Sequence, residues 1–303
     1  MIYGKILAGL YSVAIAVVMF PATSHAQGEA LETVLDKYVR THEAEIGIAV
    51  ITDRHDTVCV NNNRRYPMNS VMKLYQAMAV ANAMQRRGHR LDSVIAVRQN
   101  EMAGDTYSPM RDRYPSGDIH ISVGDLLKYS LQQSDNNACD ILFRHIISVA
   151  ETDNYIRSLG VDGFSIAADE ADMHADTSRV SDNWTRPLTA ALLINRLFTE
   201  QLYDNEYWLF LLKTLNGCTT GASRLAKPFL STNVVIGHKT GTGFPSADGH
   251  PQGINDVGFV RLPDGRCYSV AVFVKSSRYD MAETERMIAE ISEIVWRNVS
   301  VPF

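Results

Sequence analysis

The sequence predicts an α/β plus all-α fold of two domains, in which an antiparallel sheet flanked by terminal helices packs on a helical domain. Two observations lead to this prediction. Short segments rich in the β-branched and aromatic residues of strands lie near both ends of the chain, whereas helical periodicity fills the middle. The 303 residues, 46% of them hydrophobic, are enough for one large domain or two closely packed ones.

The first 26 residues have the pattern of a secretory signal. Lys5 precedes an apolar run over residues 6–20, and small residues follow at Ser24 and Ala26. This order is typical of signal peptides, and the run is shorter than the roughly 20 residues of a membrane span, which makes an uncleaved anchor the less favoured alternative. We expect cleavage after Ala26 and a periplasmic mature protein without membrane attachment.

The mature chain is expected to begin with one helix and two strands. The segments "IGIAVIT" at 46–52 and "TVCV" at 57–60 are short strands joined by polar residues. The preceding helix is indicated by apolar residues at the i, i+3, i+4, i+7, i+8 spacing, which are Leu31, Val34, Leu35, Tyr38 and Val39.

Three strands and a helix are expected at the other end of the chain. The strands are "NVVIGHKTG" at 233–241, "DVGFVRL" at 256–262 and "CYSVAVFV" at 267–274, and a hairpin turn at 263–265 joins the last two. Strands from both ends can share one sheet, with the terminal helices on one face. The α/β domain then comprises residues 27–66 and 217–303, and the all-helical domain is an insertion.

The inserted domain is expected to span residues 67–216. Helical periodicity is nearly continuous there, with loops near 100–120 and 163–186. A crevice between the two domains is a favourable place for a binding site.

Composition excludes some classes of partner and site. The net charge of −5 provides no basic field for nucleic acid. The four cysteines are scattered without metal-ligand spacing, so no zinc site is expected. We interpret them as mostly buried thiols and leave their pairing open: Cys59, Cys139, Cys218 and Cys267.

The segment "PMNSVMKLYQAM" places Ser70 and Lys73 one helical turn apart at a predicted helix entrance. A serine hydroxyl is a poor nucleophile that needs a base within hydrogen-bond reach, and lysine can serve where its proton is destabilised. The helix N-terminus also offers backbone N–H groups to a developing oxyanion. The alternative is a helix cap followed by a solvated lysine.

Two further motifs favour the catalytic interpretation. Ser134-Asp135-Asn136 follows a predicted helix, and Lys239-Thr240-Gly241 lies on a predicted strand. The three motifs in this order are those of penicillin-binding proteins and class A β-lactamases. From about Ala30 to its C-terminus the chain resembles class A serine β-lactamases.

The resemblance implies the serine β-lactamase / D,D-peptidase-like fold and a role for each matching residue. Ser70 would be acylated by the β-lactam, and Ser134 would pass a proton to the departing nitrogen. Glu170, which matches the glutamate of the family's Ω loop (about 165–183), would activate the hydrolytic water. Lys73 would help to deprotonate Ser70, and whether it or Glu170 is the acylation base stays open.

The resemblance also implies a set of substrate contacts. The backbone N–H groups of Ser70 and Thr242 would form the oxyanion hole. The other substrate-binding residues would be Tyr107, Asn136, His174, Arg224, Lys239, Thr240 and Thr242.

The sequence departs from the common pattern of the family in three places. His174 stands where an asparagine usually helps to position water, and a structural role is its alternative. Ala168 and Asn183 replace the salt bridge that closes the Ω loop, so the loop must be held differently. Arg224 resembles an arginine that some members use for the substrate carboxylate, and a solvated surface arginine is its alternative.

The Glu-x-x-x-His pattern and the altered Ω-loop positions resemble an extended-spectrum branch. The sequence therefore predicts a β-lactam amide hydrolase, with cephalosporins, including oxyimino ones, among its substrates and antibiotic resistance as the consequence. It predicts a monomer with small-molecule partners and no metal or organic cofactor. The alternatives are a D,D-peptidase, which typically lacks the deacylating glutamate, and a sensor domain that is acylated and signals.

A second Ser-Asp-Asn string at 181–183 precedes the predicted helix that begins near Pro187. Ser, Asp and Asn collect at helix entrances because their side chains accept hydrogen bonds from free N–H groups. We interpret this string as a helix cap and not as a catalytic motif.

Overall fold

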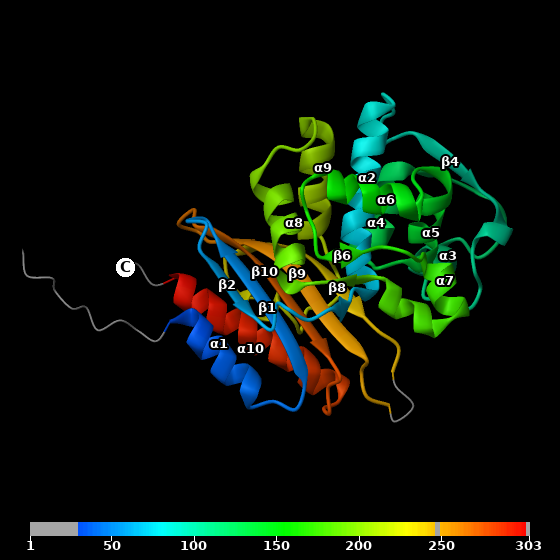
Figure 1. The fold of residues 1–303 in the computed structure, drawn as a ribbon. Helices are drawn as coiled ribbons and strands as arrows, with labels where there is room; N and C mark the ends of the chain where they lie inside the picture. The colour runs from blue at the N-terminus through cyan, green and yellow to red at the C-terminus, as the bar shows by residue number, and fades with distance from the viewer. Residues whose placement is uncertain (1–29, 246–248, 301–303) are drawn as a thin grey trace, which may run out of the picture. The chain divides into compact units, whose positions relative to one another are not determined.

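Strands from both ends of the chain form one antiparallel sheet, in the order β2-β1-β10-β9-β8 (Figure 1). The computed structural model describes residues 30–245 and 249–300. The strands of this sheet are β1 (Glu45–Thr52), β2 (Thr57–Val60), β8 (Val235–Thr242), β9 (Gly253–Arg261) and β10 (Cys267–Lys275). Strand β1 pairs with β10, with Ala49 opposite Ala271, which confirms that the two ends meet.

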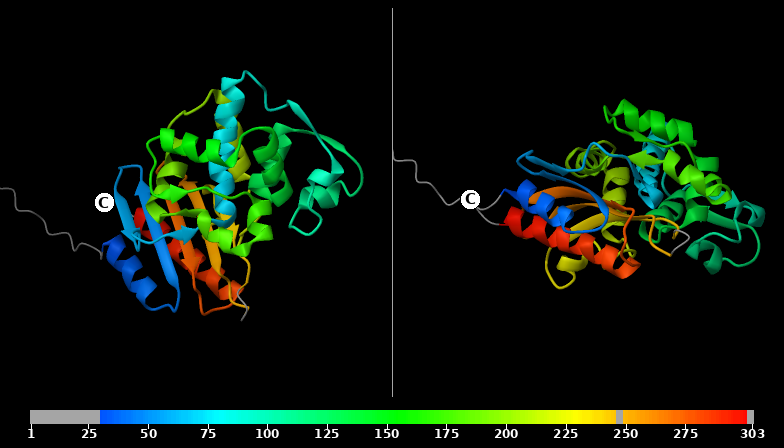
Figure 2. Two further views of the ribbon diagram at one scale, coloured as in Figure 1. Left: turned by 45° about the vertical axis from the view of Figure 1, so that its right-hand side comes forward. Right: turned by 60° about the horizontal axis from the view of Figure 1, so that its bottom comes forward.

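Helices cover both faces of the sheet. Figures 1 and 2 show α1 (Leu31–Arg40) and α10 (Met281–Ser300) side by side on one face. The other face packs against α8 (Pro187–Thr199) and α9 (Asn205–Asn216). Because side chains alternate along a strand, Val50 belongs to the core beneath the terminal helices, whereas its neighbour Ala49 belongs to the core of the central helices.

Helix α2 (Met72–Arg86) is the centre of the helical region and is buried along most of its length. An α-helix that is apolar on every side must be surrounded by other elements, and α2 packs against α4, α5, α6 and α9. The remaining α-helices are α3 (Pro109–Arg113), α4 (Val123–Gln132), α5 (Asn136–His145), α6 (Val149–Ser158) and α7 (Glu170–Ala175). Short 3₁₀ turns are η1 (Asn69–Val71), η2 (Gln99–Glu101), η3 (Thr177–Asp182) and η4 (Lys227–Phe229).

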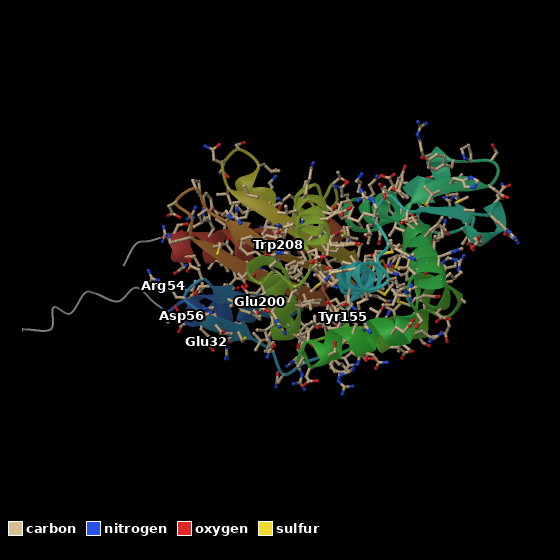
Figure 3. The ribbon with its side chains drawn as sticks, turned by 90° about the horizontal axis from the view of Figure 1, so that it is seen from above. Glu32, Arg54, Asp56, Tyr155, Glu200 and Trp208 are labelled. Atoms are coloured by element: carbon tan, nitrogen blue, oxygen red, sulfur yellow. The ribbon has the colours of Figure 1, made fainter. Side chains whose placement is uncertain are left out.

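Aromatic side chains join these helices by hydrogen bonds. Trp208 on α9, labelled in Figure 3, donates from its indole N–H to the carbonyl of Leu197 on α8 at 2.7 Å. Tyr155 on α6, also labelled there, donates its hydroxyl to that of Tyr203 at 2.8 Å. Buried polar tips of aromatic residues find partners in this way, which fixes how the helices pack.

The helical region also contains two small sheets that the sequence did not indicate. One has the strand order β3-β7-β6 and the other pairs β4 with β5. A two-residue strand carries no periodicity, so the first of these sheets leaves no signal in the sequence. The small strands are β3 (Tyr66–Pro67), β4 (Val94–Val97), β5 (Ile119–Ser122), β6 (Phe164–Ser165) and β7 (Trp184–Thr185).

The predicted hairpin between the last two strands is confirmed. Gly265 has a φ of 92°, which side chains disfavour, and the N–H of Leu262 donates to the carbonyl of Arg266 at 2.8 Å. The described residues from Leu31 onward form one compact unit. The proposed domain division at residues 66 and 216 therefore stays a prediction.

The predicted secretory signal lies outside the described residues. Within residues 30–245 and 249–300, no helix is long and apolar enough to cross a membrane.

The capping role predicted for residues 181–183 is wrong. Helix α8 does begin at Pro187, but its N-cap is Arg186, whose side chain makes no capping hydrogen bond. Proline at the first position removes one N–H that would need a partner. Residues 181 and 182 belong instead to η3, and Asn183 has a different task, described below.

Candidate active site

The three sequence motifs and Glu170 meet at one cavity of about 390 Å³. The 3₁₀ turn η1, which directly precedes helix α2, supplies Ser70, the α4–α5 junction supplies Ser134, and strand β8 supplies Thr240 and Thr242. Lys73 and Lys239 are fully buried behind its wall. The predicted residues that line the cavity are Ser70, Tyr107, Ser134, Asn136, Glu170, Arg224, Thr240 and Thr242.

Lys73 is a buried partner of Ser70. Its Nζ lies 2.8 Å from Ser70 Oγ and 2.7 Å from Asn136 Oδ1, and it also donates to the carbonyl of Ser134 at 3.2 Å. The helical turn between Ser70 and Lys73 produces the first contact, as the spacing predicted. The alternative of a solvated lysine is therefore wrong.

Lys73 also pairs with Glu170, and this pair sets its charge. The distance from Lys73 Nζ to Glu170 Oε1 is 2.6 Å. Burial alone would lower the pKa of Lys73, but the Glu170 carboxylate leads the opposing contributions and the net effect raises it above its ordinary value. The resting side chain is therefore an ammonium at neutral pH, and Glu170 is the adjacent group that can receive its proton.

Lys239 holds the hydroxyl of Ser134. Its Nζ donates to Ser134 Oγ at 2.9 Å and to the carbonyl of Thr240 at 2.8 Å. Burial and the nearby ammonium of Lys73 lower the pKa of Lys239 to about 7. Ser134 itself has a φ of 59°, and non-glycine residues in this left-handed region cluster at functional sites.

Arg224 is buried beside the cavity, with 4% of its surface exposed. Its guanidinium donates to Thr242 Oγ1 at 2.7 Å and forms an ion pair with Glu285 at 3.0 Å. The alternative of a solvated surface arginine is wrong. The ion pair with Glu285 offsets much of the positive charge of Arg224, which weakens its attraction for a substrate anion. Its hydrogen bond to Thr242 orients that hydroxyl.

At the predicted oxyanion hole, the backbone of strand β8 comes close to the residues around η1. A Cβ atom on Gly241 would lie 2.6 Å from the carbonyl oxygen of Met68, so only glycine lets strand β8 come this close to η1. Ser70 and Thr242 both line the cavity. Their backbone N–H groups remain the predicted donors.

Asn183 is the anchor of the Ω loop in place of a salt bridge. Its fully buried side chain accepts hydrogen bonds from the N–H groups of Ala167 and Ala168 at 2.8 and 3.1 Å. It donates to the carbonyl of Ala168 at 2.8 Å. One amide thus satisfies three backbone groups next to Glu170.

Arg179 is a second anchor, which the sequence reasoning missed. It pairs with Asp172 at 2.8 Å and donates to the carbonyl of Ala167 at 3.0 Å. Both sides of this ion pair are about one third exposed or more, so its contribution is small. The sequence did contain a signal for this anchor, because Arg179 is a basic residue within a loop rich in acidic residues.

His174 does not line the cavity, although it was predicted among the substrate-binding residues. Its Nε2 lies 3.0 Å from Asp105 Oδ2, and this pair is largely exposed. The imidazole thus ties the Ω loop to the loop that precedes Tyr107. Its position supports the structural alternative and not the positioning of water.

Asp140 packs behind the Ω loop and provides a test of its electrostatics. Its Oδ1 accepts the backbone N–H of Glu170 at 2.9 Å. Burial, followed by the charges of Asp169 and Glu170, raises the pKa of Asp140 from 3.8 to about 7. Because the pKa of this carboxyl is higher in the fold than in the unfolded chain, its contribution to stability is complete only below the unfolded pKa of 3.8. This contribution is lost as the pH rises from there through the folded pKa of about 7.

We expect Asp140→Asn to stabilise the protein at pH 8 by on the order of 2 kcal/mol, since asparagine keeps the acceptor and removes the charge. At pH 4 the difference should nearly vanish, because wild-type Asp140 is then protonated in the fold and the pH is close to the pKa of this carboxyl in the unfolded chain. Thermal unfolding at both pH values measures this, with exposed Asp162→Asn as the control. A gain of equal size at both pH values would contradict the electrostatic explanation.

The four cysteines are all free thiols. Cys139 is buried, but Cys59, Cys218 and Cys267 are partly exposed, so the expectation of mostly buried thiols is only partly met. Among the described residues, no group of acidic, histidine and cysteine side chains could hold a metal ion.

Comparison with known proteins decides the family. The sequence pattern of the β-lactamase enzyme family matches residues 29–299. A β-lactamase of Phocaeicola vulgatus is 40% identical over 281 residues, which cover 91% of this chain and 88% of that protein. The chain belongs to the class A β-lactamase family.

Other relatives of this class A β-lactamase family member agree. The extended-spectrum β-lactamase PER-1 of Pseudomonas aeruginosa is 33% identical over 273 residues, covering 90% of this chain and 88% of that protein. The crystal structure of a class A β-lactamase from Bacteroides cellulosilyticus superimposes with a TM-score of 0.85 at 36% identity, over 89% of this chain and 96% of that one. The family and the fold predicted from the motifs are thereby confirmed.

Proposed function

We propose that this class A family member hydrolyses β-lactams through an acyl-enzyme on Ser70. The observation that carries the proposal is the position of Lys73 Nζ, 2.8 Å from Ser70 Oγ and 2.6 Å from Glu170 Oε1. A nucleophile, a buried cation and a carboxylate thus stand in one contiguous set at the wall of a cavity.

In the acylation step, Ser70 Oγ attacks the lactam carbonyl carbon as its proton passes to the Lys73–Glu170 pair. Since resting Lys73 is an ammonium, either Lys73 first gives a proton to Glu170 or Glu170 acts through water. The C–N bond then breaks, and the nitrogen receives a proton through Ser134, whose hydroxyl Lys239 holds. The backbone N–H groups of Ser70 and Thr242 stabilise the oxyanion.

In the deacylation step, Glu170 removes a proton from a water molecule that attacks the ester carbonyl. The C–O bond to Ser70 breaks, and the serine recovers a proton from the Lys73–Glu170 pair. No metal or organic cofactor is needed for either step. The carboxylate of the substrate lies against Lys239, Thr240 and Thr242, and Arg224 orients Thr242.

We further propose that the substrates include cephalosporins with bulky side chains. A second cavity of about 920 Å³ adjoins the active site and shares Asn69, Val180, Gly243 and Phe244 with it. This space offers room for a large acylamino substituent, and the PER-1 relative carries an extended-spectrum description. A periplasmic, monomeric enzyme that confers β-lactam resistance fits this proposal.

The decisive experiment is turnover of a chromogenic cephalosporin by the mature protein, with mass spectrometry during the reaction. Many turnovers per enzyme with a transient adduct on Ser70 are expected. A single stoichiometric burst with a stable adduct would indicate a D,D-peptidase or a sensor instead. Comparing an oxyimino cephalosporin with a small penicillin tests the substrate range, and failure of the bulky substrate alone would overturn only the second proposal.

A further inference from the structure

A second cluster of reactive side chains lies behind the strand that carries Lys239. His238 lies next to Lys239 along β8 and two residues before Thr240, which pairs with Asp256 on β9, so His238, Thr240 and Asp256 share the face of the sheet opposite to Lys239. His238 Nδ1 lies 2.9 Å from Asp256 Oδ1, and both side chains are almost completely buried. The mechanism above uses neither of them.

Cys218 completes this cluster as a Cys-His-Asp chain. It lies between α9 and β8 and is partly exposed, and its contact with Thr220, which in turn contacts Thr240, places it on the side of β8 that carries His238, whose imidazole acts on the thiol. Because Nδ1 is engaged with Asp256, the other ring nitrogen is the one free to face the sulfur. A thiol next to an imidazole that a buried carboxylate orients is the arrangement that activates a nucleophilic cysteine.

The same cysteine contacts the wall of the substrate cavity. Cys218 Sγ lies 3.4 Å from Thr220 Oγ1, and this hydroxyl lies 2.6 Å from Thr240 Oγ1. Thr220 and Thr240 both line the cavity. A group attached to the sulfur would therefore displace Thr220 and disturb Thr240, the proposed partner of the substrate carboxylate.

We propose that Cys218 is a reactive thiol, activated by the His238–Asp256 pair, whose exchange with small disulfides weakens β-lactam binding at the Thr220–Thr240 pair. The second half of this proposal rests on the proposed function, whereas the reactivity of the thiol does not.

The four cysteines differ in the way that the proposal requires. Burial tends to raise the pKa of Cys218, but His238 and, more weakly, Lys239 and Thr220 outweigh it and lower this pKa to about 7. Burial also works against the charge of His238, yet Asp256, aided by Cys218, raises its pKa to about 10, so the imidazolium persists beside the sulfur. Burial raises the pKa of the other three thiols, Cys59, Cys139 and Cys267.

The exchange needs no reactant other than the disulfide itself. The thiolate of Cys218 attacks one sulfur of the disulfide, a new S–S bond forms, and the other half leaves as a thiolate that takes up a proton. At pH 7 about half of a thiol with this pKa is ionised, against about three in a hundred for an ordinary one. Lower intrinsic nucleophilicity offsets part of that gain, so reaction roughly three- to fourfold faster than that of an ordinary thiol is expected.

The test uses 2,2′-dipyridyl disulfide, whose released thiopyridone is coloured, on the full mature protein. We expect one fast phase of one thiol, mapped by mass spectrometry to Cys218, with a rate that is half-maximal near pH 7. The modified enzyme should lose at least about tenfold in kcat/KM, through KM, because the threonine pair is displaced. Dithiothreitol should restore activity.

Two variants separate reactivity from structure. Cys218→Ser should abolish the fast phase and make turnover insensitive to the reagent, whereas Cys59→Ser, another partly exposed thiol, should change neither. His238→Asn should slow labelling of Cys218. Because this variant removes a buried ion pair and could fail to fold, the pH profile of the unsubstituted enzyme is the independent measure of activation.

Labelling of Cys218 no faster than that of Cys59 or Cys267 would overturn the reactive thiol. Fast labelling without loss of kcat/KM would overturn its link to the substrate cavity. If the unmodified enzyme did not hydrolyse β-lactams, the proposed function would fail, while the labelling rates would still decide the reactivity of Cys218.

Discussion

Glu170→Gln is expected to leave acylation of Ser70 in place and to slow hydrolysis of the acyl-enzyme by about 10²–10⁴-fold, the usual contribution of a general base. Glutamine keeps the size of the side chain and an oxygen that can face Lys73 Nζ, which lies 2.6 Å from the wild-type carboxylate. It cannot take a proton from water. The acyl-enzyme should therefore accumulate after one turnover.

The measurement combines a stopped-flow burst with mass spectrometry of the intact protein. A burst of one product per enzyme, followed by a persistent adduct on Ser70, is the expected result. Asp172→Asn is the matched control, since it removes a partly exposed carboxylate from the same helix α7 and should not stop turnover. If Glu170→Gln turned over at the parent rate, Glu170 would have no part in deacylation.

The same variant addresses which group is the acylation base. In the structure Lys73 contacts both Ser70 Oγ and Glu170 Oε1, so a proton can move along this chain in either order. If the burst in Glu170→Gln is as fast as the parent's, Lys73 suffices for acylation. A burst slowed in proportion to deacylation would indicate that Glu170 acts in both steps.

The positions of Ser70, Lys73 and Lys239 could be predicted from the sequence because each lies on a motif with a definite local geometry, whereas Glu170 came from the resemblance to the family. The contact between Ser70 and Lys73 is a property of one helical turn, and it survives any change in the packing around it. Lys239 lies in a strand whose Gly241 allows a close backbone approach. The shared sheet followed from short segments rich in β-branched and aromatic residues at both ends of the chain, which is the composition of strands buried on both faces.

The roles of other residues could not be predicted, because they depend on tertiary contacts that leave no pattern in the local sequence. Asn183 resembled a helix cap because Asn caps helices often, yet its amide faces residues 167 and 168 of the same loop. The partner of His174 is Asp105, 69 positions away along the chain. His238 and Asp256, the residues proposed to activate Cys218, lie on strands β8 and β9, which follow Cys218 in the chain. No spacing rule connects such residues, so only the packed structure brings them together.

Asn183→Ala is expected to destabilise the protein by about 3 kcal/mol or more, because it leaves two N–H groups and one carbonyl unpaired at roughly 1–3 kcal/mol each. The site is fully buried, so water cannot easily replace the lost partners. Thermal unfolding should shift downward by roughly 10 °C. Since the released backbone directly precedes Glu170, deacylation should slow more than acylation.

The control for this prediction is Arg179→Ala, which removes the exposed anchor of the same loop. Its ion pair with Asp172 is solvent-accessible, so its loss should change stability by about 1 kcal/mol or less. A large effect of Asn183→Ala beside a small one of Arg179→Ala would show that the buried amide replaces the missing salt bridge. Equal effects would mean that the Ω loop is held by its surface charges, and Asn183 would then only fill space.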